Sequence, residues 1–227
     1  MHQLGSLSAK YESNQDPAAI GFDLGGGWSY GTYQLATRPG TFGYFLEFCK
    51  IHYHAIYEPL EAAGGFAAAS QGTNAFRTAW KALAALQRDL FTKAQFEFIV
   101  ASEYDVTISR MQRVNIDLSN RSYTLADVLF SLACMAGPGT FKSSGAGCCG
   151  LVFDTLTDLN AMNSVSTLDD KILIDGLYNQ KIKRIDTQRE YRAEPASIVA
   201  SVRKRVENEH IDAINELAIE RSLTPES

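Results

Sequence analysis

The stretch AKYESNQDPAAIGFDLGGGWSYGTYQLATRPGT, residues 9–41, differs from the rest of the chain and decides how the fold is interpreted. It places two acidic residues, Glu12 and Asp23, around the point where a helical pattern gives way to aromatic residues and glycines. Residues 20–38 hold five glycines among alternating β-formers, which predicts a short hairpin or small sheet. We therefore expect Glu12 at the end of a first helix and Asp23 at the start of the β element.

From residue 40 onward the pattern is mostly helical. Apolar residues at 42, 45, 46 and 49 predict a helix over 40–52 with Thr41 as its N-cap. Further helical segments are expected at 73–90, 92–105, 124–137 and 195–222. The segment 124–137 is apolar on nearly all sides, which is typical of a buried central helix. The sequence thus predicts a mainly α (α+β) single domain over 1–227, with a small β element near its N-terminus and a long C-terminal helix.

Composition and charge exclude several classes of protein. With 45% hydrophobic and 21% charged residues the chain should fold as an ordinary globular domain. Its net charge of −5 argues against a nucleic-acid binder, which needs a basic face. The longest apolar stretches, such as residues 126–137, are shorter than the ~20 residues of a membrane span. The N-terminus lacks a basic region followed by an apolar block, so we expect no cleaved secretory signal.

Cysteine and histidine spacing does not predict a metal site. Cys49, Cys134, Cys148 and Cys149 form no CxxC or Cys/His ligand pattern, so buried free thiols are expected. The pair His52 and His54 has no third ligand near it in the sequence. We therefore expect neither a metal ion nor an organic cofactor.

The two acidic residues suit glycoside hydrolysis. That reaction needs one carboxyl group that stays protonated to donate to the leaving oxygen, and a second that stays ionised. Apolar neighbours would favour the neutral form of Glu12, whereas a hydrated turn would keep Asp23 ionised. Gly25, Gly26 and Gly27 would let the backbone approach a sugar, and neighbouring aromatic rings could stack on it. From composition alone a structural hairpin stays open, because glycine-rich turns with aromatics are common.

Residues 7–48 carry a more specific pattern. It contains Lys-Tyr-Glu-Ser at a helix end, Asn-x-x-Pro, an Asp followed by glycines, Ser-Tyr-Gly-x-Tyr-Gln, and Gly-Thr before a helix. This order resembles the opening of chitosanase-like, lysozyme-superfamily peptidoglycan hydrolase domains, which occur in type VI secretion spike proteins and phage cell-wall hydrolases. Less distinctive agreement continues through residues 62–84, 95–105 and 172–184.

The resemblance implies a two-lobed lysozyme-like fold with the glycan in the cleft between the lobes. It implies that Glu12 is the general acid and Asp23 the general base of an inverting reaction, whose two carboxyl groups stand about 6.5 to 9.5 Å apart. The residues that would hold the sugar or the acids are Trp28, Ser29, Tyr30, Tyr33 and Gln34. One departure concerns Met135 and Ala136, which replace a Gln-His pair of the family that would line or support the cleft.

The function implied is that of a muramidase or lysozyme-like enzyme acting on peptidoglycan strands. It would be made in the cytoplasm and delivered to the periplasm of a target bacterium as an antibacterial type VI secretion effector, or released as a phage lysin. Expected partners are a secretion spike protein and a periplasmic immunity protein. Three alternatives remain: a chitosanase, whose cationic substrate suits the acidic chain; a lytic transglycosylase, which needs Glu12 but not Asp23; and a non-catalytic glycan-binding module.

Overall fold

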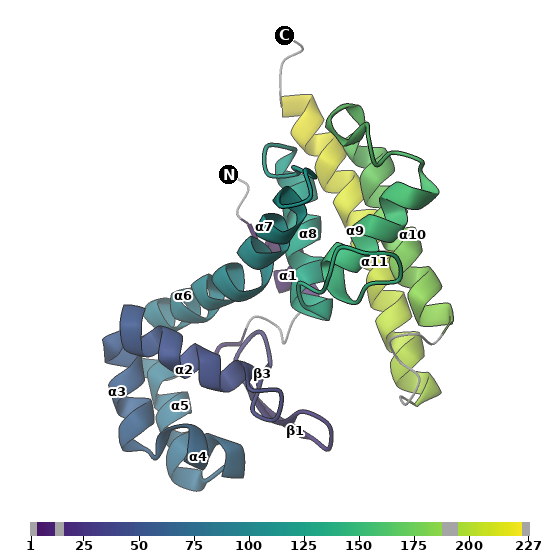
Figure 1. Ribbon diagram of the computed structural model, residues 1–227. Coiled ribbons are helices and arrows are strands. Elements are labelled where there is room, and N and C mark those ends of the chain that lie inside the picture. Colours follow the sequence, from purple (N-terminus) through teal and green to yellow (C-terminus); the bar gives the residue numbers. More distant parts are fainter. Residues whose placement is uncertain (1–3, 12–15, 188–194, 224–227) are drawn as a thin grey trace. The chain divides into compact units, whose positions relative to one another are not determined.

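The computed structural model describes residues 4–11, 16–187 and 195–223. The chain forms two compact units, one made of residues 12–102 and one made of residues 1–11 and 103–227. We call the first the sheet unit, because it contains the strands, and the second the α8 unit, after its most buried helix (Figure 1).

The sheet unit begins with a three-stranded antiparallel sheet in the order β1, β2, β3 and continues as helices. The strands are β1 (Ile20–Asp23), β2 (Gly27–Tyr30) and β3 (Leu35–Ala36). The helices are α2 (Thr41–His52), α3 (His54–Ala62), α4 (Gly65–Gln71), α5 (Asn74–Leu86) and α6 (Arg88–Ile99), followed by a π-helical turn, η2 (Val100–Tyr104). The predicted small sheet near the N-terminus is confirmed.

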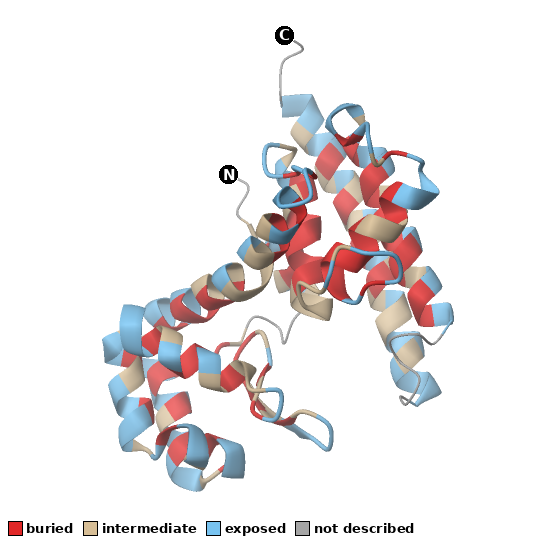
Figure 2. Cartoon of the chain, viewed as in Figure 1, coloured by how far each residue is buried: buried red, intermediate tan, exposed pale blue. Residues whose placement is uncertain are grey.

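Aromatic rings fill the core of the sheet unit. Tyr30 from β2 lies 4.8 Å from Phe42 of α2, and Trp80 of α5 lies 4.6 Å from Phe91 of α6, measured between ring centroids. All four side chains are fully buried. Buried residues occur along the helices of both units (Figure 2). Because large aromatic side chains dominate the energy of burial, this cluster fixes the sheet against the helices.

The described residues of the α8 unit form helices joined by loops and contain no strand. Its helices are α1 (Ser6–Tyr11), α7 (Asp105–Gln112), α8 (Tyr123–Ala136), α9 (Gly147–Asp158), a short 3₁₀ turn η3 (Val165–Thr167), α10 (Asp170–Asp186) and α11 (Ala196–Leu223). Helix α8 contacts α1, α9, α10 and α11. Its side chains are buried on almost every side, which confirms the prediction for the apolar segment 124–137. The long C-terminal helix is also confirmed.

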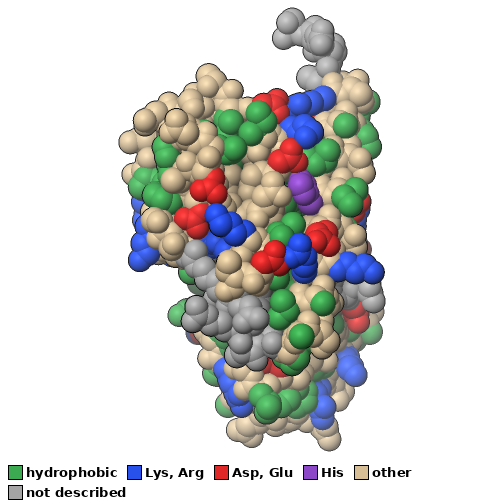
Figure 3. Space-filling view, turned by 90° about the vertical axis from the view of Figure 1, so that its right-hand side faces the viewer, with side chains coloured by type: hydrophobic (Ala, Val, Ile, Leu, Met, Phe, Trp, Pro, Cys, Tyr) green, Lys and Arg blue, Asp and Glu red, His purple; other side chains and the backbone are tan. Residues whose placement is uncertain are grey.

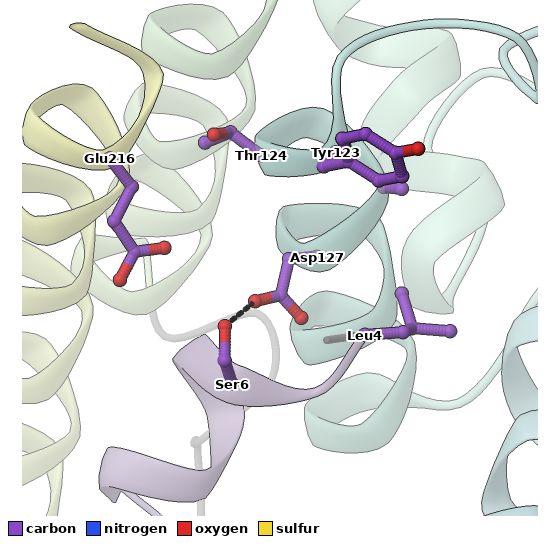
Figure 4. Close-up of a pocket in the computed structure, with 7 residues that line it drawn as sticks. Leu4, Ser6, Tyr123, Thr124, Asp127 and Glu216 are labelled. Carbon is purple, nitrogen blue, oxygen red and sulfur yellow. Dashed lines mark hydrogen bonds between the residues drawn. The ribbon is translucent and has the colours of Figure 1, made fainter. Parts of the chain in front are cut away.

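In the α8 unit, two carboxylates accept hydrogen bonds from backbone N–H groups at the first residues of helices. Asp127 of α8 accepts hydrogen bonds from the Gly5 and Leu7 N–H groups and from Ser6 Oγ at the beginning of α1 (Figure 4). Glu220 of α11 accepts from the N–H groups at residues 123 and 124. The first four N–H groups of a helix have no partner within it, so these acids stabilise both helix starts. The pocket beside Asp127 is small, with a volume of about 30 Å³.

Three local predictions are wrong in detail. Gly40, in the left-handed conformation, precedes α2, so Thr41 is the first helical residue and not the N-cap. The segment 73–90 is not one helix, because the chain breaks at Gln87 and α6 begins at Arg88. The segment 92–105 runs from α6 through the π-helical turn into α7.

Charged side chains of both signs are interspersed on the face of the molecule drawn in Figure 3. Ion pairs of the α8 unit such as Lys171 with Asp175 and Arg203 with Glu207 show the same mixing along α10 and α11. No helix in the described parts of the chain is both long enough and apolar enough to span a membrane.

Candidate active site

One face of the sheet is aromatic. Residues that pair across antiparallel strands share a face. Phe22 pairs with Trp28, Ile20 pairs with Tyr30, and Tyr30 also pairs with Leu35. We call these five residues the aromatic face, and Tyr30 packs it onto α2 and α5.

The other face is small and polar. Here Gly21 pairs with Ser29, Ser29 pairs with Ala36, and Asp23 pairs with Gly27. We call these five residues the polar face. Its polar side chains are the exposed Asp23 carboxylate and the Ser29 hydroxyl, and Ser29, like Gly27, is buried.

Asp23 lies at the end of β1, in the turn to β2, and not at the start of the β element as predicted. Its side chain is exposed, and Oδ1 accepts hydrogen bonds from the N–H groups of Gly25 (2.8 Å) and Gly26 (2.5 Å). A backbone N–H group can only donate a hydrogen bond, and an ionised carboxylate oxygen can only accept one, so these partners match. Within the described residues Oδ2 accepts no hydrogen bond. The glycine run therefore orients the carboxylate through one of its two oxygens.

Ser29 and Gln34 are brought together on the polar face. Ser29 Oγ donates to Gln34 Oε1 at 2.8 Å, and Gln34 Nε2 donates to the Gly31 carbonyl at 3.0 Å. Gln34 has a left-handed backbone (φ 50°), which is uncommon for a residue with a side chain. A Cβ on Gly21 would lie 2.9 Å from Ser29 Oγ and 3.2 Å from Gln34 Oε1. Glycine at position 21 is thus needed for this pair to form as it does.

None of the three aromatic residues predicted to bind sugar, Trp28, Tyr30 and Tyr33, belongs to the polar face. Tyr30 is fully buried, and its hydroxyl donates to the Ala69 carbonyl at 2.9 Å, so the expectation that its ring stacks on a sugar is wrong. Trp28 is half-buried on the aromatic face, with the Arg77 guanidinium 5.2 Å from its ring. Tyr33 is half-buried in the turn between β2 and β3. Trp28 therefore does not share a face with Asp23.

Glu12, the predicted general acid, lies outside the described residues. The described residues nearest to it in the chain are Tyr11, whose hydroxyl donates to Asp212 at 2.8 Å, and Asp16.

Glu103 is a titratable residue that the sequence patterns did not single out. It lies in the π-helical turn, a rare geometry that is often found at functional sites. Burial raises the pKa of its carboxyl to about 7, although the nearby Arg110 acts in the opposite direction. Its buried Oε2 has no hydrogen-bond partner among the described residues. Residues 95–105 also contain Glu97 and Asp105, so the sequence carries no signal that sets Glu103 apart.

Met135 and Ala136, the departure from the resembling family, are half-buried at the end of α8. They immediately precede Gly137, where an added Cβ would lie 3.8 Å from Glu103 Oε2. An apolar pair at this position offers no side-chain donor to the glutamate, which agrees with its raised pKa.

The remaining candidates for chemistry have structural explanations. His52 and His54 are exposed, and the described residues contain no group of three or more His, Cys, Asp or Glu side chains that could hold a metal ion. All four cysteines are free thiols, as predicted. Burial raises the pKa of Cys49 to about 12 and that of Cys149 to about 11, so neither is an activated nucleophile.

The fold is that of a chitosanase-like, lysozyme-type glycoside hydrolase. A native chitosanase from Bacillus subtilis superposes with a TM-score of 0.58 over 95% of this chain and 87% of its own, at 16% identity. A Glu-to-Ala mutant of that chitosanase, complexed with 6 GlcN, gives a TM-score of 0.58 over 97% of this chain and 88% of its own, also at 16% identity. At this identity the likeness establishes the fold.

The sequence comparison identifies the family. Residues 4–210 match the family described as "Type VI secretion system spike protein VgrG3-like, C-terminal", and the chain belongs to it. The type VI secretion system spike protein VgrG3 of Vibrio cholerae is 26% identical over 220 residues, which cover 96% of this chain and 19% of that protein. The chain therefore spans about a fifth of the length of this relative.

Proposed function

We propose that this chain is a glycoside hydrolase that cleaves the glycan strands of bacterial peptidoglycan, in the manner of a muramidase. The observation that carries the proposal is the exposed Asp23 carboxylate, oriented by two backbone N–H groups on a polar face otherwise made of small residues. An exposed carboxylate held in one orientation suits catalysis on a sugar polymer. Membership of the VgrG3-like C-terminal family and the chitosanase-like fold support the same reaction class.

In the proposed mechanism Glu12 protonates the oxygen of the leaving sugar, and Asp23 removes a proton from the attacking water. The water attacks from the opposite side of the ring, so the configuration at the sugar carbon inverts. Asp23 Oδ2 is the oxygen that would accept the proton, because Oδ1 is held by Gly25 and Gly26. Gln34, which accepts a hydrogen bond from the buried Ser29, would bind a sugar hydroxyl, and Tyr33 would border the bound strand. Trp28, on the opposite face of the sheet from Asp23, would not contact it.

Delivery follows from the family. Since a relative of this chain is a secretion spike protein, we propose that the domain travels with a type VI spike and acts in the periplasm of a target bacterium. A periplasmic immunity protein would then protect the producing cell. The alternative is that the domain is a phage lysin, which is released without a secretion system.

A chitosanase is the second candidate. The solved structures similar to this chain include a chitosanase complexed with 6 GlcN, a chain of cationic sugars. The net charge of −5 on this chain would attract a polycation. A lytic transglycosylase would use Glu12 alone, and a binding module would use neither acid for chemistry.

The test is release of reducing ends from purified peptidoglycan and from chitosan. Wild type should release them from peptidoglycan, and Asp23→Asn should not. Asp89→Asn serves as the matched control, because Asp89 is also an exposed aspartate of the sheet unit but lies on α6. Release from chitosan alone would favour the second candidate, and binding without release from either polymer would favour the module.

A further inference from the structure

Gln95 is a polar side chain placed in the centre of the sheet unit. It projects from α6, between the buried residues Phe91 and Phe98 of the same helix, and is fully buried. Burying an amide costs free energy unless its hydrogen bonds are satisfied, and an apolar residue would fill a helix-packing position more cheaply. The presence of an amide here therefore calls for a role other than packing.

The amide of Gln95 joins two segments that are distant in the sequence. Its Oε1 accepts from the Thr32 N–H at 3.0 Å, and its Nε2 donates to the Pro17 carbonyl at 3.1 Å. The Trp80 indole N–H also donates to the Pro17 carbonyl, at 3.0 Å. A Cβ on Gly31 would lie 2.3 Å from Gln95 Oε1, so the turn at Gly31 approaches the amide closely only because it lacks a side chain.

Both joined segments lead to the candidate site. Pro17 lies five positions after Glu12 in the chain. On the other side, the Gly31 carbonyl accepts from Gln34 Nε2, and Gln34 Oε1 accepts from Ser29 Oγ. An unbroken series of contacts thus runs from the Pro17 carbonyl through the buried amide to the polar face.

We propose that Gln95 is a positioning residue, which holds Pro17 in a fixed register with the turn that carries Gln34. The role rests on the proposed function, because it concerns the geometry of the glycan site. Only a side chain with a donor and an acceptor in one planar group can satisfy the Pro17 carbonyl and the Thr32 N–H together. Gln95 acts through other residues and does not itself contact the substrate.

Two substitutions separate positioning from packing. Gln95→Met keeps the volume and removes both hydrogen bonds. Gln95→Glu keeps the acceptor for Thr32 but, when ionised, has no donor for Pro17. Burial favours the neutral form of an introduced carboxyl, and the neutral acid can donate to the Pro17 carbonyl again. Phe98→Leu is the control, because it removes volume from the same buried helix without touching the series of contacts.

The measurement is kcat and KM on peptidoglycan fragments against pH, together with hydrogen exchange at the Thr32 amide. We expect Gln95→Met to lower kcat roughly tenfold to a hundredfold, since a displacement near 1 Å can cost that much, and to speed exchange at Thr32. The activity of Gln95→Glu relative to wild type should rise as the pH falls, which a loss of packing would not produce. Phe98→Leu should keep the wild-type pH profile.

Two results would overturn the inference in distinguishable ways. If wild type is active and the Gln95 variants match Phe98→Leu in kcat and in pH profile, the positioning role is wrong while the proposed function stands. If wild type itself releases no fragments, the proposed function fails and the positioning role fails with it. If Gln95→Met does not fold, the positioning role is tested by Gln95→Glu alone. Its activity relative to wild type is then compared between low and high pH, and the absence of a rise at low pH would contradict the role.

Discussion

The aromatic and polar faces of the sheet are made from alternate residues of the same strands, yet they are held in place by different forces. The aromatic face is fixed by buried area, with Tyr30 in contact with Phe42, Phe76 and Trp80. The polar face is fixed by a few directed hydrogen bonds, such as those to Asp23 Oδ1. Under the proposed function, stability depends on one side of this small sheet and chemistry on the other, so substitutions on the two faces should have different consequences.

The largest effect is expected for Asp23→Asn. Removing a general base commonly costs a factor of about 10² to 10⁴ in rate, and the exposed side chain contributes little to packing. The rate of reducing-end release should fall by that factor while the thermal midpoint of unfolding stays near the wild-type value. If Asp23→Asn lowered the thermal midpoint as well as the rate, the polar face would have a structural role, and the proposed difference between the two faces would be wrong.

Tyr30→Ala should produce the opposite pattern. Truncating a large buried aromatic residue costs about 3 to 5 kcal/mol of unfolding free energy, because it leaves a cavity. Denaturant unfolding measures this loss. Tyr30→Phe, the matched control, removes only the hydroxyl that donates to Ala69 and should cost about 1 kcal/mol. Activity per folded molecule should survive in Tyr30→Phe, and its loss there would mean that Tyr30 does act on substrate.

Gly21→Ala tests whether the polar face depends on small residues. The added Cβ would lie 2.9 Å from Ser29 Oγ, so the Ser29 and Gln34 side chains must separate. We expect kcat/KM to fall about tenfold, equivalent to ~1.4 kcal/mol of transition-state stabilisation. Gly43→Ala is the control, since its Cβ would come no nearer than 3.4 Å to the Phe66 ring. Equal activities of the two variants would contradict a role for Ser29 and Gln34.

The last effect is a pH dependence of stability at Glu103, in the α8 unit, which is read from the free energy of unfolding and not from the rate. Burial raises its pKa from 4.5 to about 7, so the folded state holds more protons than the unfolded state between these values. Stability contributed by this group is complete below pH 4.5 and is lost as the pH rises through 7. Unfolding of Glu103→Gln, followed from pH 5 to pH 8, should show a smaller decline than wild type. Parallel curves would mean that the carboxyl is solvated and titrates normally.

Much of the fold could be predicted because it depends on periodicity. The continuous apolarity of residues 124–137 indicated a buried helix, and alternation in residues 20–38 indicated strands. The break at Gln87 carries no glycine or proline, and the π-helical turn has no composition signal, so neither was foreseen. Both depend on tertiary packing, which overrides local propensity.

Only part of the candidate site could be predicted, because the rest depends on contacts between segments that are not neighbours in the sequence. The motif around Asp23 singled out the residues, but their division between two faces requires the strand register, which fixes that Tyr30 points inward. Gln95 is one of several polar residues of α6, and nothing in the sequence sets it apart until its partners Pro17 and Thr32 are known. A contact between distant segments leaves no local pattern in a sequence.

The measurement that tests the central claim most directly is mass spectrometry of the soluble fragments released from purified peptidoglycan by wild type, Glu12→Gln and Asp23→Asn. We predict muropeptides with intact reducing ends from wild type and none from the two variants, each shown to be folded. Anhydro products, which lack one water, with Asp23→Asn still active would mean that the polar face supplies no general base. Fragments released equally by all three proteins would contradict the assignment of both acids.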